Sequence, residues 1–492
     1  MLLLNLDRAS AVPLYLQIAQ QLAARIDAGA LAAGEALSPT RLLAQRLGVN
    51  RSTVCRAYAQ LQASGHVESC AGGYTRVRAR AAATDAARTS DGHFDWGSRL
   101  RSATSPAQSV QAVGDGIDFR PLAPDPRLAP VHALRRAMKL ALADDTAGLL
   151  DYPSPLGHLP LRQWIAERMA RLGATLTADS VMLCNGAQHG LDLAFRTLLA
   201  PGANVAVEAP GYACAHALIA QHGANPIGVP IRDDGLDLAA LAAVIAQHRP
   251  AALYTMPNFQ NPTGITTPIA HREQLMRLCE ANALPIIEDG FAEDMKYFGR
   301  AVPPLKALDR QGLVIHVGTF SKLLFPGLRV GWIAASPTLI AALAATRSTA
   351  DLGGSALPAA ALWQLCASGE FDRHLRRLHT EYRRRMQRLI RATRTWLTSE
   401  RVRCSVPQGG YVCWVEVDGG GPSTRIDSPS DEAGLIAALA AAGVRVTPGA
   451  NCYPAGHTPA GAAFRLSIAQ VDEANIERGV QRIGEVLRAR RP

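Results

Sequence analysis

The chain has 492 residues, 48% of them hydrophobic, and a formal net charge of +10. This length exceeds what one hydrophobic core serves, so two or three domains are expected. No apolar run approaches the roughly 20 residues of a membrane span, and residues 1–6 lack the basic start of a signal peptide. Nine scattered cysteines without a C-x-x-C pair argue against a disulfide framework or a metal site, and they favour free thiols in the cytoplasm.

The first 80 residues form a small basic segment. They contain nine arginines and four acidic residues, which is half of the chain's net charge in about a sixth of its length. Such a local excess of positive charge is an electrostatic indication of nucleic acid binding. Taken alone the indication is weak, since many basic surfaces are only solvated.

Helical periodicity predicts two helices in the first half of this segment. The first is expected to have Pro13 in its first turn and to end at Gly29. Its apolar face is formed by Leu14, Ile18, Leu22 and Ile26. The second is expected to have Ser38 as its cap and Pro39 in its first turn, to bury Leu43 and Leu47, and to end at Gly48.

A third helix is expected to begin after a cap at Asn50. Its inner face is predicted to contain Val54, Ala57, Tyr58 and Leu61. Residues 65–69 and 74–77 then predict a two-stranded wing joined across Gly72 and Gly73. The alternative is a small helical domain with a polar outer face. The candidates for DNA contact are Arg41, Arg51, Ser52, Thr53, Arg56 and Arg76.

This segment resembles the winged helix-turn-helix of GntR-type regulators. The entry to their second helix, a hydrophobic residue followed by Pro-Ser-Ser-Arg, stands here as Leu-Ser-Pro-Thr-Arg at residues 37–41. The Arg-Pro-Gly-Ser-Gly of their wing is replaced by Cys-Ala-Gly-Gly-Tyr at residues 70–74. The resemblance implies binding to double-stranded DNA.

Residues 81–116 are rich in Ala, Ser, Thr and Gly and are interpreted as a linker. From residue 117 apolar runs alternate with helical stretches, which predicts a parallel sheet with helices on both faces. The candidate strands are 181–185, 205–208, 251–256, 285–287 and 313–317. Each ends at a cluster of polar residues or glycine, and these clusters should converge on one crevice at the carboxyl ends of the strands.

Lys322 is one of only four lysines, against 47 arginines. Arginine does not lose its proton in proteins, whereas a neutral lysine amine forms Schiff bases. Close to it in the sequence are two hydroxyl groups, at Thr319 and Ser321, and a guanidinium, at Arg329. This combination is suited to a phosphate beside an aldehyde, as in pyridoxal 5'-phosphate.

The order and spacing of these clusters resemble those of fold-type I enzymes of the aspartate aminotransferase class, which depend on pyridoxal 5'-phosphate. By that resemblance Lys322 holds the cofactor as a Schiff base, Asp289 pairs with the pyridine nitrogen and Asn261 bonds the phenolic oxygen. Tyr212 stacks on the ring, and Arg465 grips a carboxylate of the ligand. The residues implied around the phosphate are Gly186, Ala187, Gln188, Thr319, Ser321 and Arg329, with Tyr152 reaching it from a partner subunit.

One position departs from that pattern. Relatives have a tyrosine two residues beyond the ring-pairing aspartate, and its hydroxyl donates to the phenolic oxygen. Here Phe291 follows Glu288-Asp289-Gly290. The missing donor predicts a raised aldimine pKa and weak catalysis.

A winged helix-turn-helix joined to an aminotransferase-like domain is the layout of the MocR subfamily of GntR regulators. The resemblance implies an α/β protein with a DNA-binding domain at 1–80, a linker at 81–116 and an aspartate aminotransferase-type domain at 117–490. A large subdomain is expected at about 150–345, and a small one at 346–490 together with 117–149. The implied function is a homodimeric transcriptional regulator that senses an amine or amino acid as an external aldimine. A working aminotransferase with a fused DNA-binding domain is the alternative.

Overall fold

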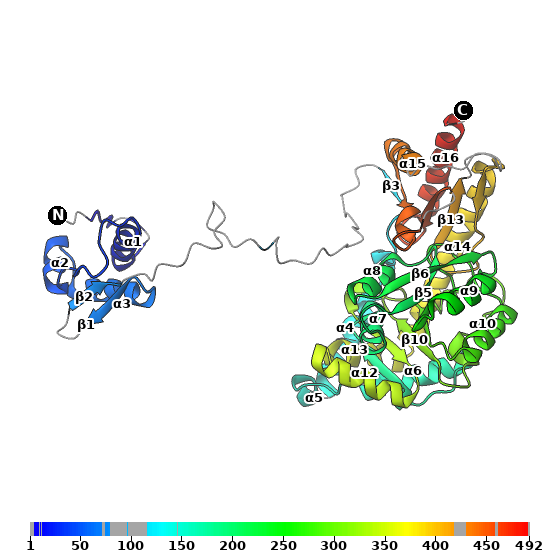
Figure 1. Ribbon diagram of the computed structural model, residues 1–492, viewed down its shortest axis with the longest axis horizontal. Coiled ribbons are helices and arrows are strands. Elements are labelled where there is room, and N and C mark those ends of the chain that lie inside the picture. The colour runs from blue at the N-terminus through cyan, green and yellow to red at the C-terminus, as the bar shows by residue number, and fades with distance from the viewer. Residues whose placement is uncertain are drawn as a thin grey trace. The chain divides into compact units, whose positions relative to one another are not determined.

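The computed structural model describes residues 4–8, 10, 12–70, 74–78, 96, 116–144, 146–417, 430–457 and 461–490. The chain divides into two compact units, residues 1–102 and 103–492 (Figure 1). The predicted linker at 81–116 lies outside the described residues except for Trp96 and Gly116. Within the described residues, no helix has both the length and the apolar character needed to cross a membrane.

The smaller unit contains three helices and a hairpin, as predicted. The helices are α1 (Leu14–Asp27), α2 (Thr40–Leu47) and α3 (Arg51–Ala63). Strands β1 (Val67–Cys70) and β2 (Tyr74–Val77) pair antiparallel, and the turn predicted at residues 72–73 lies outside the described residues. The core of the unit contains the predicted inner face of α3 together with Ile18, Leu22, Leu43, Val67 and Val77.

The predicted helix ends at Asn50 and Gly48 are present, but Pro13 and Pro39, both predicted in a first turn, instead precede their helices as extended residues. The Asn50 side chain accepts a hydrogen bond of 3.1 Å from the Ser52 N–H, and Gly48 ends α2 with a φ of 63°. The predicted cap at Ser38 is wrong, because Pro39 itself is the extended residue before α2. The helix therefore begins one residue later than predicted, and Ser38 stands one position too early to cap it. The Ser38 carbonyl instead accepts a hydrogen bond of 2.7 Å from the Tyr58 hydroxyl.

The larger unit is built on an eight-stranded sheet. Its order is β4-β11-β10-β9-β8-β5-β6-β7. The strands are β4 (Val181–Cys184), β5 (Asn204–Ala209), β6 (Asn225–Arg232), β7 (Gly235–Leu236), β8 (Ala252–Thr255), β9 (Ile286–Gly290), β10 (Val314–Thr319) and β11 (Gly331–Ala334). Strands β6, β5, β8, β9 and β10 are parallel, whereas β7 and β11 are antiparallel to their neighbours. All five predicted strands are therefore present.

Successive residues of the central strands enter different cores. Val205 and Val207 of β5 pack in one core and Ala206 in the other, as expected when side chains alternate across a sheet covered on both faces. In Figure 1, α12 and α13 lie on one side of the strands and α9 and α10 on the other. The helices of this part are α4 (Val131–Asp144), α5 (Thr146–Leu150), α6 (Leu159–Arg171), α7 (Ala187–Leu198), α8 (Ala213–Gln221), α9 (Leu238–His248), α10 (Ile269–Ala281), α11 (Leu305–Leu308), α12 (Pro337–Ala350) and α13 (Ala356–Ala367).

The C-terminal part of the larger unit has a second sheet, of order β12-β13-β16-β15. Its strands are β12 (Val402–Cys404), β13 (Val412–Val417), β15 (Thr447–Pro448) and β16 (Ala462–Ser467). Its helices are α14 (Glu370–Trp396), α15 (Ser430–Ala441) and α16 (Glu473–Ala489). A separate pair joins β3 (Ile117–Asp118) to β14 (Val444–Arg445), which ties the start of this unit to its C-terminal part. The 3₁₀ helices are η1 (Pro126–Leu128), η2 (Ala178–Ser180), η3 (Pro326–Leu328) and η4 (Ala450–Cys452).

Candidate functional site

A cavity of about 350 Å³ lies at the carboxyl edge of the large sheet. Strand β11 is antiparallel to both β4 and β10, so β4 points the same way as β10 and its parallel neighbours. The polar clusters after these strands therefore meet at one edge. The predicted site residues that line the cavity are Ala187, Gln188, Tyr212, Asn261, Asp289, Thr319, Ser321, Lys322, Arg329 and Arg465.

Lys322 lies in the turn that follows β10. Burial lowers the pKa of its amine to about 8, and repulsion from Arg465 adds to this, while attraction to Asp289 opposes it. The lowered pKa gives a substantial neutral fraction near physiological pH. A neutral amine is the form that attacks a carbonyl carbon.

Asp289 lies near the end of β9 and is 2% exposed. Its Oδ2 accepts a hydrogen bond of 2.8 Å from the Tyr254 hydroxyl, while its Oδ1 is buried and has no donor within the described residues. Burial raises the pKa of this carboxyl to about 6, against the opposing hydrogen bond from Tyr254. A buried acceptor without a donor fits a ligand that brings a protonated nitrogen.

Donor groups gather where α7 begins. Gly186 precedes the helix with a φ of 85°, and the first-turn N–H groups of a helix have no carbonyl partner inside it. A Cβ on Gly186 would lie 2.9 Å from Nη2 of Arg329, so a side chain here would push that guanidinium aside, and the positive φ itself favours glycine. The hydroxyls of Thr319 and Ser321 lie 3.0 Å apart on the cavity wall. These groups together can bind a phosphate.

Asn261 is positioned by a buried hydrogen-bond network. Oε2 of Glu208, at the end of β5, accepts a bond of 2.9 Å from the Gln260 amide, whose own oxygen accepts bonds from the Thr263 N–H and hydroxyl. Oε1 of Glu208 accepts from the Thr255 hydroxyl at 2.6 Å. The network orders the loop after β8 and holds Asn261 at the cavity. Burial raises the Glu208 pKa to about 7.

Tyr212 precedes α8, and its hydroxyl donates to Oε1 of Gln188 at 3.2 Å. This bond links the start of α8 to the start of α7 across the cavity wall. An aromatic ring beside a flat heterocycle favours stacking.

Arg465 belongs to β16 of the second sheet. Its side chain is 8% exposed and lines the cavity. Its Nη1 donates to Oδ1 of Asn261 at 2.9 Å, and its Nη2 donates to the Arg120 carbonyl and the Thr447 hydroxyl. Its Nε has no acceptor among the described residues, and none of their carboxylates forms an ion pair with it. Burial lowers the pKa of this guanidinium. A buried cation of this kind favours an anionic ligand such as a carboxylate.

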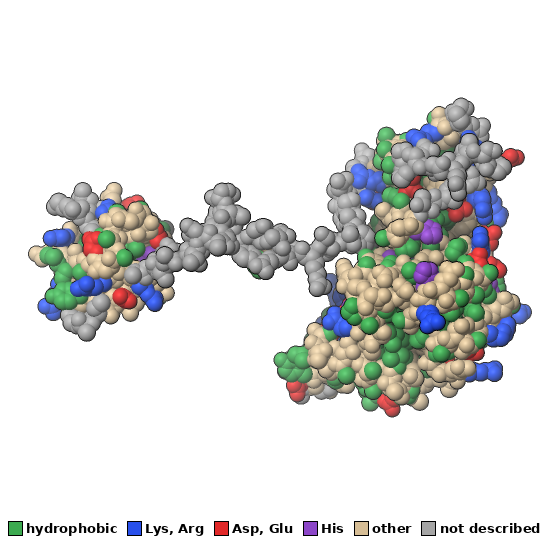
Figure 2. Space-filling view, in the orientation of Figure 1, with side chains coloured by type: hydrophobic (Ala, Val, Ile, Leu, Met, Phe, Trp, Pro, Cys, Tyr) green, Lys and Arg blue, Asp and Glu red, His purple; other side chains and the backbone are tan. Residues whose placement is uncertain are grey.

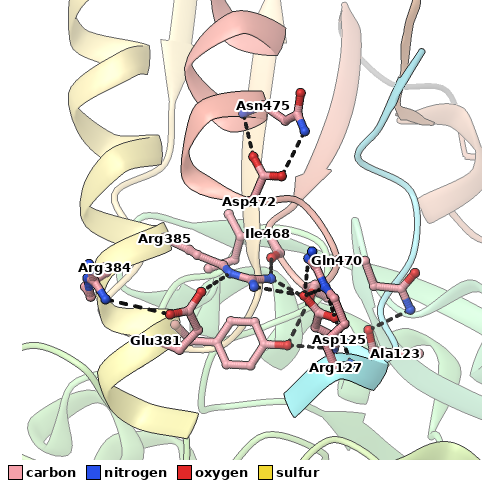
Figure 3. A network of polar contacts seen from close by, with 12 residues as sticks. Ala123, Asp125, Arg127, Glu381, Arg384, Arg385, Ile468, Gln470, Asp472 and Asn475 are labelled. Atoms are coloured by element: carbon pink, nitrogen blue, oxygen red, sulfur yellow. Dashed lines mark hydrogen bonds and ion pairs between the residues drawn. The ribbon is translucent and has the colours of Figure 1, made fainter. Parts of the chain in front are cut away.

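One wall of the cavity was not predicted from the sequence. It consists of residues 120–123, which precede a buried ion pair between Asp125 and Arg385 of α14 at 2.9 Å. Figure 3 shows Arg385 pointing toward Asp125, beside Gln470, which donates to the Ala123 carbonyl at 3.2 Å. The hydrogen bonds from Arg127 and Arg385 outweigh burial and lower the Asp125 pKa to about 2. No local pattern reveals this anchor, because its partners are 260 residues apart.

Tyr152 is not part of the cavity of its own chain. It follows α5 and is 80% exposed, and nearby Leu150 is 82% exposed. Apolar side chains of α4 are exposed as well, among them Leu140 at 48%. Adjacent exposed apolar residues are typical of a protein interface.

In the smaller unit, five of the six candidate DNA-contacting residues are exposed, and Thr53 is half-buried. The guanidinium of Arg56 lies 4.5 Å from the centre of the Tyr15 ring, a contact that the sequence did not predict. Figure 2 shows basic side chains at several places on the surface of this unit.

Two families match this chain. Residues 14–77 match the gntR family of bacterial regulatory proteins, and residues 123–483 match class I and II aminotransferases. The regulatory protein MocR of Rhizobium meliloti, named as a probable regulator of rhizopine catabolism, is 33% identical over 80% of this chain and 81% of its own length. The chain belongs to the MocR-type GntR regulators. The prediction made from the sequence is confirmed.

Proteins named as HTH-type transcriptional regulators align over nearly the whole chain. The transcriptional regulator TauR of Rhodobacter capsulatus is 30% identical over 96% of both chains. Among solved structures, the alpha-aminoadipate aminotransferase LysN of Thermus thermophilus is 29% identical, with a TM-score of 0.71, over 80% of this chain and 99% of its own. That structure contains N-(5'-phosphopyridoxyl)-L-leucine. The predicted fold is therefore confirmed.

The cavity of this MocR-type chain fits pyridoxal 5'-phosphate, as predicted. The open Oδ1 of Asp289 suits a protonated ring nitrogen, and the donors around Gly186 suit the phosphate. The amine of Lys322 lines the same cavity. The individual role of each residue stays a prediction.

Proposed function

We propose that this chain is a DNA-binding transcriptional regulator that senses an amine or amino acid in its aminotransferase-like domain. The observation that carries the proposal is the shared cavity of Lys322 and Arg465. The first supplies an amine of lowered pKa, and the second a buried cation without a carboxylate partner among the described residues. In a chain with a GntR-type DNA-binding unit, such a cavity suits ligand sensing.

The ligand is expected to have an amine at one end and a carboxylate, or a similar anion such as a sulfonate, at the other. Pyridoxal 5'-phosphate, when bound, supplies an aldehyde that condenses with primary amines. Asp289 and Asn261 would orient the ring of the bound cofactor, and Arg465 would bind the anionic group of the ligand. Lys322 would hold the aldehyde in competition with the ligand's amine, and its own amine, when free, would hold a proton inside the cavity.

Sensing requires that the ligand bind two arrangements of the protein unequally. Arg465 links β16 to Asn261 and to the carbonyl of Arg120, so an anion at Arg465 acts on both sides of the cavity. The ligand is expected to change DNA affinity by roughly 5- to 150-fold, the usual range of coupling between sites.

The regulator is proposed to act as a homodimer in the cytoplasm. The exposed residues Leu140, Leu150 and Tyr152 support a dimer interface, in which Tyr152 would complete the phosphate site of the partner subunit. Two DNA-binding units in one dimer would contact paired half-sites.

A spectral titration of the cofactor-loaded protein with amines and amino acids tests this function, run beside a DNA-binding assay on its own upstream region. We expect one class of ligand to change both the cofactor absorbance and the DNA affinity. Lys322→Ala should abolish the DNA response to this ligand while some DNA affinity remains. An unchanged response in that variant would contradict the proposal.

Transamination is a second candidate, because Lys322, Asp289 and Arg465 share one cavity as a catalytic site requires. Multiple turnover with an amino acid and a keto acid, at rates typical of enzymes, would favour it over sensing.

A further inference from the structure

Helix α14 carries an unusual concentration of positive charge. It has nine arginines and three acidic residues over its 27 positions. Residues 81–492 together carry a net charge of +5, whereas this helix alone carries +6, so the rest of that segment is close to neutral. The basic character of the larger unit is therefore local.

Four of these arginines have carboxylate partners. Arg385 is buried against Asp125, and Figure 3 shows Arg384 turned toward Glu381. Arg373 lies 2.7 Å from Glu370, and Arg388 lies 3.4 Å from Glu477. These four contribute to the packing and surface ion pairs of the unit itself.

The other five are exposed and have no carboxylate within 4.0 Å among the described residues. They are Arg376, Arg377, Arg383, Arg391 and Arg394. At 100° per residue, Arg376, Arg383 and Arg394 project within about 20° of one line along the helix, and the other two lie within about 100° of it. We name these five residues the arginine face. The line from Arg376 to Arg394 spans roughly 27 Å.

With only solvent around them, these arginines repel one another, and this repulsion destabilises the folded protein. Arginine is also the side chain best suited to phosphate, because its planar guanidinium donates two parallel hydrogen bonds. The smaller unit of the same molecule matches the gntR family of regulators, so DNA is the polyanion that this chain is expected to bind. A length of roughly 27 Å corresponds to about eight base pairs at 3.4 Å each.

We propose that the arginine face of α14 binds the phosphate backbone of DNA that flanks the sequence held by the helix-turn-helix. The proposal rests on the DNA-binding part of the proposed function and does not depend on the identity of the effector. Contacts to phosphates do not read sequence, so the face adds affinity and salt dependence without adding specificity.

The test uses the full-length, cofactor-loaded protein and two duplexes from its own upstream region. The short duplex is the shortest one that the wild-type protein still binds. The long duplex extends it by about three helical turns on each side. The variant combines Arg376→Gln, Arg377→Gln, Arg391→Gln and Arg394→Gln. A control variant combines Arg373→Gln, Arg384→Gln and Arg388→Gln, which lie on the same helix but pair with carboxylates.

We expect the wild-type protein and the control to bind the long duplex at least tenfold more tightly than the short one. The four-residue variant should lose this advantage and keep its affinity for the short duplex. For the long duplex, the slope of log affinity against log salt concentration should become shallower in this variant, by about 0.9 for each lost phosphate contact. Equal preference for the long duplex in variant and wild type would overturn the proposal, as would an equal loss on both duplexes. Failure of the wild-type protein to bind any duplex from its own upstream region would overturn the proposed function itself.

Discussion

The hydroxyl of Tyr254 donates a hydrogen bond of 2.8 Å to Oδ2 of Asp289. Both residues are buried on neighbouring parallel strands, β8 and β9. This bond satisfies one carboxylate oxygen and leaves Oδ1 as the acceptor without a donor among the described residues. Tyr254 therefore orients the carboxylate that is proposed to meet the cofactor.

Tyr254→Phe should weaken cofactor binding about tenfold, because loss of one hydrogen bond to a charged group costs about 1.5 kcal/mol. Equilibrium dialysis of the cofactor measures this effect. Tyr297→Phe is the matched control, since the hydroxyl of Tyr297 is buried without a partner among the described residues. Equal affinities in the two variants would show that Tyr254 does not orient Asp289.

Covalent capture of the cofactor should become faster as pH rises, with a midpoint near pH 8. Burial lowers the pKa of Lys322 to about 8, so the neutral, reactive amine predominates above that pH and the protonated amine below it. Stopped-flow absorbance of cofactor-free protein mixed with pyridoxal 5'-phosphate at several pH values measures the rate. A midpoint above pH 10 would place Lys322 in an aqueous environment.

Phe291 lines the cavity and is 7% exposed, and its side chain has no group that donates a hydrogen bond. Phe291→Tyr should lower the pKa of the lysine-bound cofactor by about one unit, because a phenol donor stabilises the deprotonated form. A pH titration of the visible absorbance compares the two proteins. Identical midpoints would mean that the introduced hydroxyl does not reach the cofactor.

Arg465→Lys should weaken binding of an amino acid at least tenfold and leave binding of the corresponding decarboxylated amine within about twofold. Lysine keeps the charge but loses the paired donors that hold a carboxylate. Spectral titration of both ligands separates a lost anion contact from general damage to the cavity. A parallel loss for both ligands would argue against a carboxylate at Arg465.

Asp125→Ala should lower the free energy of unfolding by about 3 kcal/mol, because it leaves Arg385 buried without its main partner. Urea denaturation followed by fluorescence measures the loss. Asp233→Ala is the control, since Asp233 is 97% exposed and its pair with Arg403 is worth less than about 1 kcal/mol. A loss no larger than in the control would mean that the ion pair does not anchor the cavity wall.

Local sequence patterns predicted the elements of the protein well. The inner face of α3, the cap at Asn50 and the five strands lie where periodicity and turn residues put them. These features are encoded within a few residues, because a helix or strand must bury one face and satisfy its own ends. Ser38 was predicted wrongly, because Pro39 is itself extended and α2 begins one residue later than the pattern indicates.

The sequence by itself also determined the set of reactive groups, since parallel strands end at a common edge and their terminal residues have to meet there. Only the tertiary structure decided that Tyr254 bonds Asp289, that residues 120–123 close the cavity, and that Arg385 reaches Asp125. It also decided which arginines of α14 are paired and which are exposed. Such contacts join residues up to 260 positions apart. These contacts form only when the layers of the fold pack together, so the periodicity of a single segment does not predict them.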